Sequence, residues 1–492
     1  MALHRKMVNH IEHEADDHFH DECGVFGIYG RADAASFTTL GLHALQHRGQ
    51  EAAGIVTYDN EQFHIERHVG LIGDNFTKEN VIKRLPGDCS IGHTRYATTG
   101  GSSIRNIQPL FAELDGGGLA VAHNGNITNA LTVQRDLQRR GAIFSSTSDT
   151  ETILHLIAMS DKKDIMSKFN EAVLQLEGAF SLVAMTAKKM IGCRDPHGIR
   201  PLVLGDLDGS WILASETCAL DIMGARFVRE VAPGEVVVIT KKGIESYFPF
   251  GKNQNSKFCI FEFVYFARPD SAMQGESVYT VRKRIGEELA RESGVEADIV
   301  VPVPDSGTPA AIGYAQAANL PFELGIIRNH YVGRTFIAPT DHIRHMGVKL
   351  KHNANRGLLE GKRVILVDDS IVRGTTSQKI VAMVREAGAK EVHMRIASPP
   401  TMSSCYYGVD TPERTKLLAS RMSVAEMADF IRVDSLSFLS IDGLYRAVGE
   451  ANRNNDMPQF CDACFTGQYP TRLLDQDGRN NVRKLSLLAN NN

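Results

Sequence analysis

Residues Arg363–Ser377 read Arg-Val-Ile-Leu-Val-Asp-Asp-Ser-Ile-Val-Arg-Gly-Thr-Thr-Ser, and this stretch decides the fold of the second half of the chain. Its apolar run Val364–Val367 is typical of a parallel strand that is buried on both faces. Asp368 and Asp369 follow at the carboxyl end of that strand, which is the edge where open α/β sheets bind ligands. Gly374–Ser377 then opens a predicted helix, whose free N–H groups and hydroxyls can bind a phosphate. The stretch therefore predicts a site for a phosphorylated sugar.

A second buried strand that ends in a turn is predicted in Ile299–Gly307, which reads Ile-Val-Val-Pro-Val-Pro-Asp-Ser-Gly. Together the two stretches resemble the type I phosphoribosyltransferases, α/β proteins that bind 5-phosphoribosyl-1-pyrophosphate (PRPP). The alternative is an ordinary strand–loop–helix crossover with a chance acidic pair. The resemblance implies a backbone cradle for pyrophosphate near Ser306 and one Mg²⁺ per subunit at Ser306, Asp368 and Asp369. The PRPP-binding residues it implies are Asp368, Asp369, Arg373, Gly374, Thr375, Thr376, Ser377, Tyr331 and Arg334.

Length and composition set the wider limits. At 492 residues the chain exceeds one ordinary domain, and its hydrophobic content of 43% supports large cores. A net charge of −4 and the lack of a basic tract argue against nucleic acid as a partner. No apolar run approaches the ~20 residues that a membrane span needs, and the polar N-terminus does not resemble a secretory signal. We therefore expect a cytoplasmic protein whose eight cysteines form no disulfides.

The first half carries a series of short motifs. It begins with Cys23-Gly-Val-Phe-Gly-Ile-Tyr-Gly, in which Val25–Tyr29 is predicted to be a short strand. Further motifs follow in the order Leu45–Gly54, Gly92–Thr98, His123–Asn126 and Ser148–Glu151. Each motif is weak alone, but their order and content resemble the class II glutamine amidotransferases. That resemblance implies an N-terminal-nucleophile hydrolase domain with four αββα layers.

The chemistry of amide hydrolysis explains these residue types. A thiolate is the strongest nucleophile that a side chain offers, so Cys23 is the candidate, with a buried structural thiol as the alternative. If the polar leader before it is removed, its own α-amino group, with a pKa near ~8, can act as the general base. By resemblance, Asn124 and the Gly125 N–H form the oxyanion hole. Arg95 would bind the α-carboxylate of glutamine and Asp149 its α-ammonium group.

Three other segments carry expectations. Arg48 is expected either to touch substrate or to pair with Glu51. Phe258–Phe266 reads as an aromatic strand, and the helix predicted at Val278–Leu289 carries a basic stripe, Arg282–Arg284, expected to be solvated.

A long basic segment, Asn329–Asn355, shows little periodicity. It resembles the catalytic loop that folds over PRPP in the transferase family, and an exposed loop is the alternative. Tyr331, Arg334 and Phe336 are the candidates for its hinge and for sealing a passage for ammonia.

The remaining cysteines fall into two groups. Cys89, Cys193 and Cys218 have no companion spacing and are expected to be buried thiols. The second half contains Cys259, Cys405, Cys461 and Cys464, of which the last two are separated by two residues. Four such thiolates suit either a structural zinc or a [4Fe–4S] cluster, and spacing alone does not choose between them.

Both resemblances together identify the chain as a member of the amidophosphoribosyltransferases. One branch of this family has a cleaved leader and a [4Fe–4S] cluster at cysteines matching these four, which implies one cluster per subunit. The implied reaction hydrolyses glutamine at Cys23 and transfers the ammonia to C1 of PRPP, giving 5-phosphoribosylamine, glutamate and pyrophosphate. This is the first committed step of de novo purine (IMP) synthesis. The family further implies a homotetramer inhibited by purine nucleotides.

Two alternative functions compete with this interpretation. Another class II amidotransferase, such as the one that makes glucosamine 6-phosphate, would not need the signature at Asp368–Ser377. A PRPP-responsive regulator would need a DNA-binding module and would not need Cys23, Arg95 and Asn124 together.

These signals divide the chain into four parts. The boundary between the two halves falls in the polar, Gly- and Asn-rich stretch Gly251–Lys257. The predicted parts are a leader at 1–22, an amidotransferase domain at 23–252, a phosphoribosyltransferase domain at 258–470 and a polar tail at 471–492, expected to be disordered.

Overall fold

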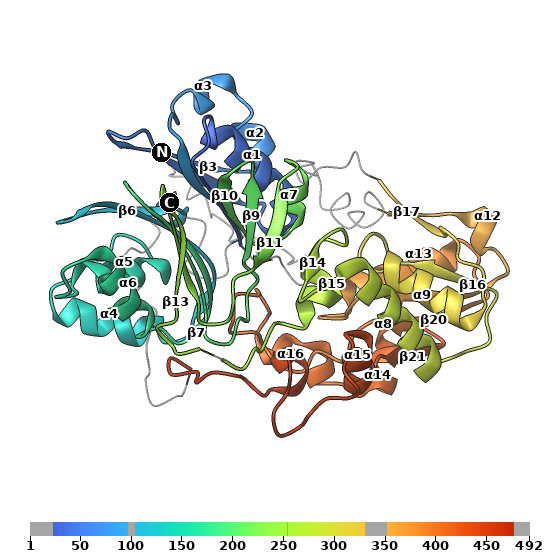
Figure 1. Ribbon diagram of the computed structural model, residues 1–492. Coiled ribbons are helices and arrows are strands. Elements are labelled where there is room, and N and C mark those ends of the chain that lie inside the picture. Colours follow the sequence, from blue (N-terminus) through green and yellow to red (C-terminus); the bar gives the residue numbers. More distant parts are fainter. Residues whose placement is uncertain (1–22, 97–103, 253, 330–351, 477–492) are drawn as a thin grey trace, which may run out of the picture.

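The computed structural model describes residues 23–96, 104–252, 254–329 and 352–476 (Figure 1). The predicted leader, the tail beyond residue 476 and the candidates Tyr331, Arg334 and Phe336 lie outside these ranges. No helix in the described ranges is long and apolar enough to cross a membrane.

The first half contains two stacked antiparallel sheets. In the described residues, one has the order β11-β9-β10-β1-β4-β2-β3 and the other β13-β12-β8-β7-β6-β5. The strands of the first are β11 Arg226–Glu230, β9 Val203–Leu207, β10 Ser210–Ala214, β1 Gly24–Tyr29, β4 Cys89–Arg95, β2 Ala52–Tyr58 and β3 Phe63–Val69. Those of the second are β13 Gly243–Tyr247, β12 Val236–Thr240, β8 Met190–Arg194, β7 Gly178–Thr186, β6 Gly117–Ile127 and β5 Leu110–Leu114.

Strand β1 shows why this half has four layers. Side chains alternate between the faces of a strand, so Val25 enters the core between the two sheets while Phe26 and Ile28 pack beneath helices on the other face. Helices α1 (Ala34–Ala44) and α7 (Cys218–Asp221) cover that outer face. The outer face of the second sheet is covered by α4 Ala130–Arg139, α5 Thr150–Ala158 and α6 Ile165–Val173. The predicted αββα fold is confirmed.

The second half is built on a parallel sheet with the order β16-β19-β20-β21 in the described residues. The predicted strand is β19 (Arg363–Asp368), and its apolar residues are fully buried because helices cover both faces. The other strands are β16 Ile299–Pro302, β20 Glu391–Ile396 and β21 Ser435–Phe438. The main helices are α8 Val278–Glu292, α9 Thr308–Ala318, α13 Thr375–Glu386, α14 Val424–Ile431 and α15 Ile441–Ala447. The predicted phosphoribosyltransferase-type α/β fold is confirmed.

Shorter elements complete both halves. They are α2 Ile72–Asn75, α3 Glu79–Ile82, α12 Arg356–Leu359, α16 Ala463–Thr466, and the strand pairs β14 Ala272–Met273 with β15 Glu276–Ser277 and β17 Ile326–Arg328 with β18 His352–Ala354.

Helices α8 and α9 touch through their backbones at two glycines. A Cβ atom on Gly286 would lie 1.8 Å from the Ala310 carbonyl oxygen, and one on Gly313 would lie 2.0 Å from that of Lys283. This contact holds α9 close against α8, and α9 begins directly after the predicted pyrophosphate turn.

Two expectations for this half are wrong. Phe258–Phe266 is not a strand, because residues Glu262–Phe266 form a π-helical turn. Arg282 is buried instead of solvated, and its guanidinium donates to the carbonyl oxygens of Phe263 (2.8 Å), Tyr265 (2.7 Å) and Ala267 (2.8 Å). The charge of Arg282 therefore satisfies the carbonyl groups that the turn exposes.

The start of the tail is also ordered, contrary to expectation. The Asp475 carboxylate accepts hydrogen bonds from the backbone N–H groups of Leu131 (2.8 Å) and Thr132 (3.1 Å). These N–H groups belong to the first turn of α4, so Asp475 caps that helix from a distant part of the chain. The tail thus returns from the second half to the first.

Candidate active sites

Cys23 lies immediately before β1, next to the last residues of β4. Its thiol donates a hydrogen bond to the Tyr96 carbonyl oxygen at 3.7 Å. Burial raises the pKa of this thiol to about 11, while Arg95 lowers it and Asp149 and Glu51 raise it. Cys23 therefore lies close enough to Arg95 and Asp149 to feel both charges. Burial therefore favours the protonated thiol, and attack of a protonated thiol on an amide requires a base.

Asn124 lies on β6 and is completely buried. Neither atom of its side-chain amide has a hydrogen-bond partner in the described structure. Buried amides are nearly always paired, so an open one indicates a position where a ligand binds. The next residue, Gly125, has a φ of 137° that favours glycine. Both residues fit an oxyanion hole, since a side-chain N–H and a backbone N–H can donate to one oxygen.

The strand segment around Asn124 is held by neighbouring side chains. His93 on β4 lies 3.1 Å from the His123 carbonyl oxygen, and the His123 N–H donates to the Gln108 side chain at 2.7 Å. Burial lowers the pKa of His93 to about 3, so the ring is neutral and its Nε2–H is the donor. One Asp149 carboxylate oxygen accepts from the Ile127 N–H at 3.0 Å. Asp149 thus connects the strand of Asn124 with the surroundings of Cys23.

The predicted PRPP site lies at the carboxyl end of β19. The Asp369 N–H donates to the Asp368 carboxylate at 2.9 Å, and the Ser370 hydroxyl donates to the Asp369 carboxylate at 2.6 Å. The other carboxylate oxygen of Asp369 is buried without a hydrogen-bond partner in the described structure. Gly374, with a φ of 80°, turns the chain into α13. The acidic pair and the helix N-terminus therefore adjoin each other.

The pyrophosphate turn packs against the same end of β19. A Cβ atom on Gly307 would lie 2.4 Å from the Val367 carbonyl oxygen and 3.3 Å from the Asp368 Cα atom. The turn that carries Ser306 is therefore close to the acidic pair. Carboxylate and hydroxyl oxygens are the ligands that Mg²⁺ prefers, and Mg²⁺ uses few protein ligands besides substrate phosphates. The residues present fit a magnesium ion.

Four cysteines from distant segments line one small cavity. It is lined by Cys259, Cys405, Cys461 and Cys464 together with Arg200. Backbone hydrogen bonds join these segments: the Ile260 N–H donates to the Cys461 carbonyl at 3.1 Å, and the Met402 N–H donates to that of Cys464 at 2.9 Å. Cys89, Cys193 and Cys218 are buried thiols, as expected.

The chemistry of these four thiols fits either a zinc ion or a [4Fe–4S] cluster, because thiolates are ligands of both. Burial raises the pKa of the Cys259 thiol to about 11, and the buried Arg200 beside it supplies a positive charge for thiolates.

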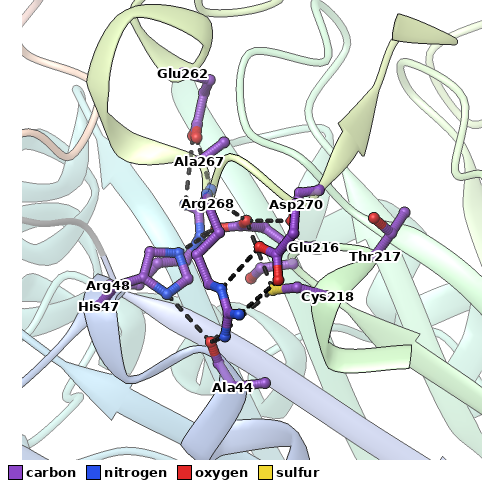
Figure 2. A network of polar contacts seen from close by, with 12 residues as sticks. Ala44, His47, Arg48, Glu216, Thr217, Cys218, Glu262, Ala267, Arg268 and Asp270 are labelled. Carbon is purple, nitrogen blue, oxygen red and sulfur yellow. Dashed lines mark hydrogen bonds and ion pairs between the residues drawn. The ribbon is translucent and has the colours of Figure 1, made fainter. Parts of the chain in front are cut away.

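A buried charge network joins the two halves (Figure 2). The Arg48 guanidinium pairs with Glu216 and, at 2.6 Å, with Glu262. Glu216 also accepts hydrogen bonds from the Arg268 N–H at 2.9 Å and the Ser271 hydroxyl at 2.7 Å. The structure therefore places Arg48 against two carboxylates at the junction, partners that neither alternative from the sequence included. Glu216 lies at the interface between the two halves.

Arg200 is a residue whose role the sequence did not reveal. It is completely buried, donates to the Tyr407 carbonyl at 2.9 Å and pairs with Glu262 at 3.2 Å. The available signal was the segment Arg194–Pro201, with its Asp-Pro-His-Gly turn and two arginines, but the partners of Arg200 lie far away in the sequence.

Two domain families match the chain. Residues 93–221 match a glutamine amidotransferase domain, and residues 275–398 match a phosphoribosyl transferase domain. A Rhizobium etli protein named amidophosphoribosyltransferase is 60% identical over 481 residues, which are 96% of this chain and 97% of that protein. The Bacillus subtilis protein of that name is 48% identical and covers 92% of this chain and 95% of its own.

Solved structures agree with the sequence relatives. The B. subtilis glutamine PRPP amidotransferase complexed with ADP and GMP has 47% identity and a TM-score of 0.87. It covers 92% of this chain and 98% of its own. A second structure, described as the allosteric regulatory enzyme of purine biosynthesis, has 48% identity and a TM-score of 0.88, over 92% of this chain and 97% of its own. With near-complete coverage at such identity, the chain belongs to the amidophosphoribosyltransferase family.

Proposed function

We propose that this enzyme hydrolyses glutamine at Cys23 and transfers the ammonia to C1 of PRPP, giving 5-phosphoribosylamine, glutamate and pyrophosphate in purine biosynthesis. The observation that carries the proposal is the pairing of two complementary sites in one chain. The first half contains the Cys23 thiol and the buried Asn124 amide, which has no hydrogen-bond partner in the described structure. The second half contains the acidic pair Asp368 and Asp369 beside the N-terminus of α13.

The glutaminase half-reaction follows from the groups around Cys23. Arg95 binds the α-carboxylate of glutamine and Asp149 binds its α-ammonium group, which places the side-chain amide against the thiol. Attack by sulfur forms a tetrahedral intermediate, whose oxyanion accepts hydrogen bonds from the Asn124 amide and the Gly125 N–H. Collapse of the intermediate releases ammonia and leaves a thioester, which water hydrolyses to glutamate.

The base in this step is the α-amino group of Cys23 itself. Burial raises the pKa of the Cys23 thiol, which favours its protonated form, and a carbonyl oxygen is its hydrogen-bond partner in the described residues. An N-terminal amine with a pKa near ~8 is partly neutral and lies next to the sulfur. The proposal therefore includes removal of the leader 1–22.

In the second half-reaction, ammonia displaces pyrophosphate from C1 of PRPP. Asp368 and Asp369 hold the ribose hydroxyls, the N-terminus of α13 holds the 5-phosphate, and the turn at Ser306 holds the pyrophosphate. Mg²⁺, when bound near Ser306, Asp368 and Asp369, would offset the charge of the leaving pyrophosphate.

We further propose a [4Fe–4S] cluster on Cys259, Cys405, Cys461 and Cys464. Three segments distant in the sequence supply these thiolates, so a bound cluster would hold them together and contribute to folding free energy. Binding of purine nucleotides as inhibitors, a homotetramer and a cytoplasmic location belong to the same proposal. The ADP and GMP in the related B. subtilis structure support the first of these.

Replacing the nucleophile should separate the two activities. We expect Cys23→Ala to lower glutamine-dependent pyrophosphate release by at least about 1,000-fold, because no other thiol lies in the site. Activity with added ammonium chloride should stay within about twofold, since the PRPP site is chemically separate. Cys89→Ala, a buried thiol on the adjacent strand β4, is the matched control and should retain both activities. An equal loss of both activities in Cys23→Ala would refute the division of labour.

The mass of the active enzyme tests the proposed base. Intact-mass spectrometry should show a chain that begins at Cys23. The kcat/KM for glutamine should rise with pH through an apparent pKa near ~8, because the neutral amine is the active form. An active enzyme that still begins at Met1 would rule out the amine as the base.

Metal analysis tests the cluster. Anaerobic purification should yield a brown protein with about four iron and four sulfide per chain. Cys461→Ser should give mostly insoluble protein without iron, whereas Cys193→Ala, at a buried thiol outside the cavity, should keep its iron. Stoichiometric zinc in place of iron would overturn the assignment.

A further inference from the structure

A turn from the second half lies directly on the predicted oxyanion strand. This turn, Cys405–Gly408, is called the cysteine turn here. The Asn126 side chain on β6 donates to the Tyr406 carbonyl oxygen at 2.9 Å. A Cβ atom on Gly408 would lie 3.0 Å from the Gly125 Cα and carbonyl carbon atoms. The cysteine turn and the segment Gly125–Asn126 are therefore in direct contact, backbone against backbone.

Gly125 is enclosed on its other side by β7. A Cβ atom at Gly125 would lie 2.1 Å from the Ala179 carbonyl oxygen. Neither Gly125 nor Gly408 can therefore carry a side chain without displacing its neighbour. Since the Gly125 N–H is a proposed oxyanion donor, the orientation of its peptide group depends on both walls, one from each half of the chain.

The cysteine turn is itself held by contacts from both halves. Within the second half, the Cys405 N–H donates to the Thr411 hydroxyl at 2.7 Å, and the Tyr407 N–H donates to the Cys405 sulfur at 3.3 Å. From the first half, the buried Arg200 donates to the Tyr407 carbonyl. These contacts give the turn a defined shape, so it can act as a rigid support for the strand it touches.

We propose that the cysteine turn positions the oxyanion hole, with Gly408 and the hydrogen bond between Asn126 and Tyr406 as its positioning contacts. The second half thereby sets the rate of glutamine hydrolysis in the first, even before PRPP binds. The inference rests on the proposed function, because Gly125 matters only if Cys23 attacks an amide. It assigns Gly408 and Asn126 to positioning and gives neither a contact with substrate.

The test is Gly408→Ala, which adds a methyl group against Gly125. We expect the kcat of glutamate release from glutamine to fall about 10- to 100-fold. Complete loss of one oxyanion donor lowers kcat by ~10²–10³-fold, and here the donor is displaced but not removed. The KM for glutamine should stay within about twofold. The rate at which iodoacetamide alkylates Cys23, followed by mass spectrometry, should also stay within about twofold of the wild-type rate. Displacement of iodide develops no oxyanion, so this reaction does not depend on the oxyanion hole. Ammonia-dependent activity should be unchanged.

Gly449→Ala is the matched control. Gly449 lies in the same half with a φ of 96°, against 111° for Gly408, and has no atom near a built Cβ. Gly449→Ala therefore introduces similar backbone strain without a contact to Gly125, and it should keep full glutaminase activity. Asn126→Ala, which removes the hydrogen bond to Tyr406, should lower kcat about 3- to 10-fold and decides the question if Gly408→Ala fails to fold.

Three results would overturn the inference. They are unchanged glutamate release in Gly408→Ala and Asn126→Ala, an equal fall of the glutamine and ammonia activities, or slower alkylation of Cys23 in step with slower hydrolysis. If the wild-type enzyme failed to form phosphoribosylamine, that result would count against the proposed function. The comparison of the variants with the wild type would still be decisive, because it measures glutamate release directly.

Discussion

The rest of the structure depends on the burial of one guanidinium, that of Arg48, between carboxylates from both halves of the chain (Figure 2). Burial alone would raise the pKa of Glu216, yet Arg48 and His47 hold that pKa well below its usual value. The stabilisation that the ionised Glu216 carboxylate provides is therefore present above the ordinary pKa of 4.5, and it is lost as the pH falls below that value. Removing one partner of such a pair costs about 3–5 kcal/mol, because the other charge stays buried.

This junction ties both sites to one framework. Arg48 precedes Gly49, where a Cβ atom would lie 2.6 Å from the Arg95 backbone nitrogen, so the junction adjoins Arg95 in the first site. Glu216 follows β10, which pairs with β1 and hence fixes Cys23. Glu262 follows Cys259 and contacts Arg200, which donates to the cysteine turn. The charges that hold the halves together thus belong to the same scaffold as the catalytic groups.

Features with a local signal could be predicted from the sequence. The run Val364–Val367 forms a strand as expected, because a strand covered on both faces is continuously apolar. The neighbours of Arg48 and Arg282 could not be predicted. Arg48 meets Glu262 across 214 residues, and Arg282 meets the carbonyl groups of a π-helical turn whose aromatic sequence favours a strand. Whether a charged side chain is buried depends on such distant partners. The local sequence shows only a stripe of charged residues on a helix, and that pattern predicts a face exposed to solvent.

In the proposed function, one chain makes its own ammonia and uses it at the second site. The most direct test supplies glutamine labelled with ¹⁵N in its amide, PRPP, Mg²⁺ and an equal concentration of unlabelled ammonium chloride, and measures the isotope in phosphoribosylamine by mass spectrometry. The account predicts that the product carries ¹⁵N almost completely, because the two sites share a rigid framework and the glutamine nitrogen passes between them. Dilution of the label to the ratio of the free ammonium pool would contradict it.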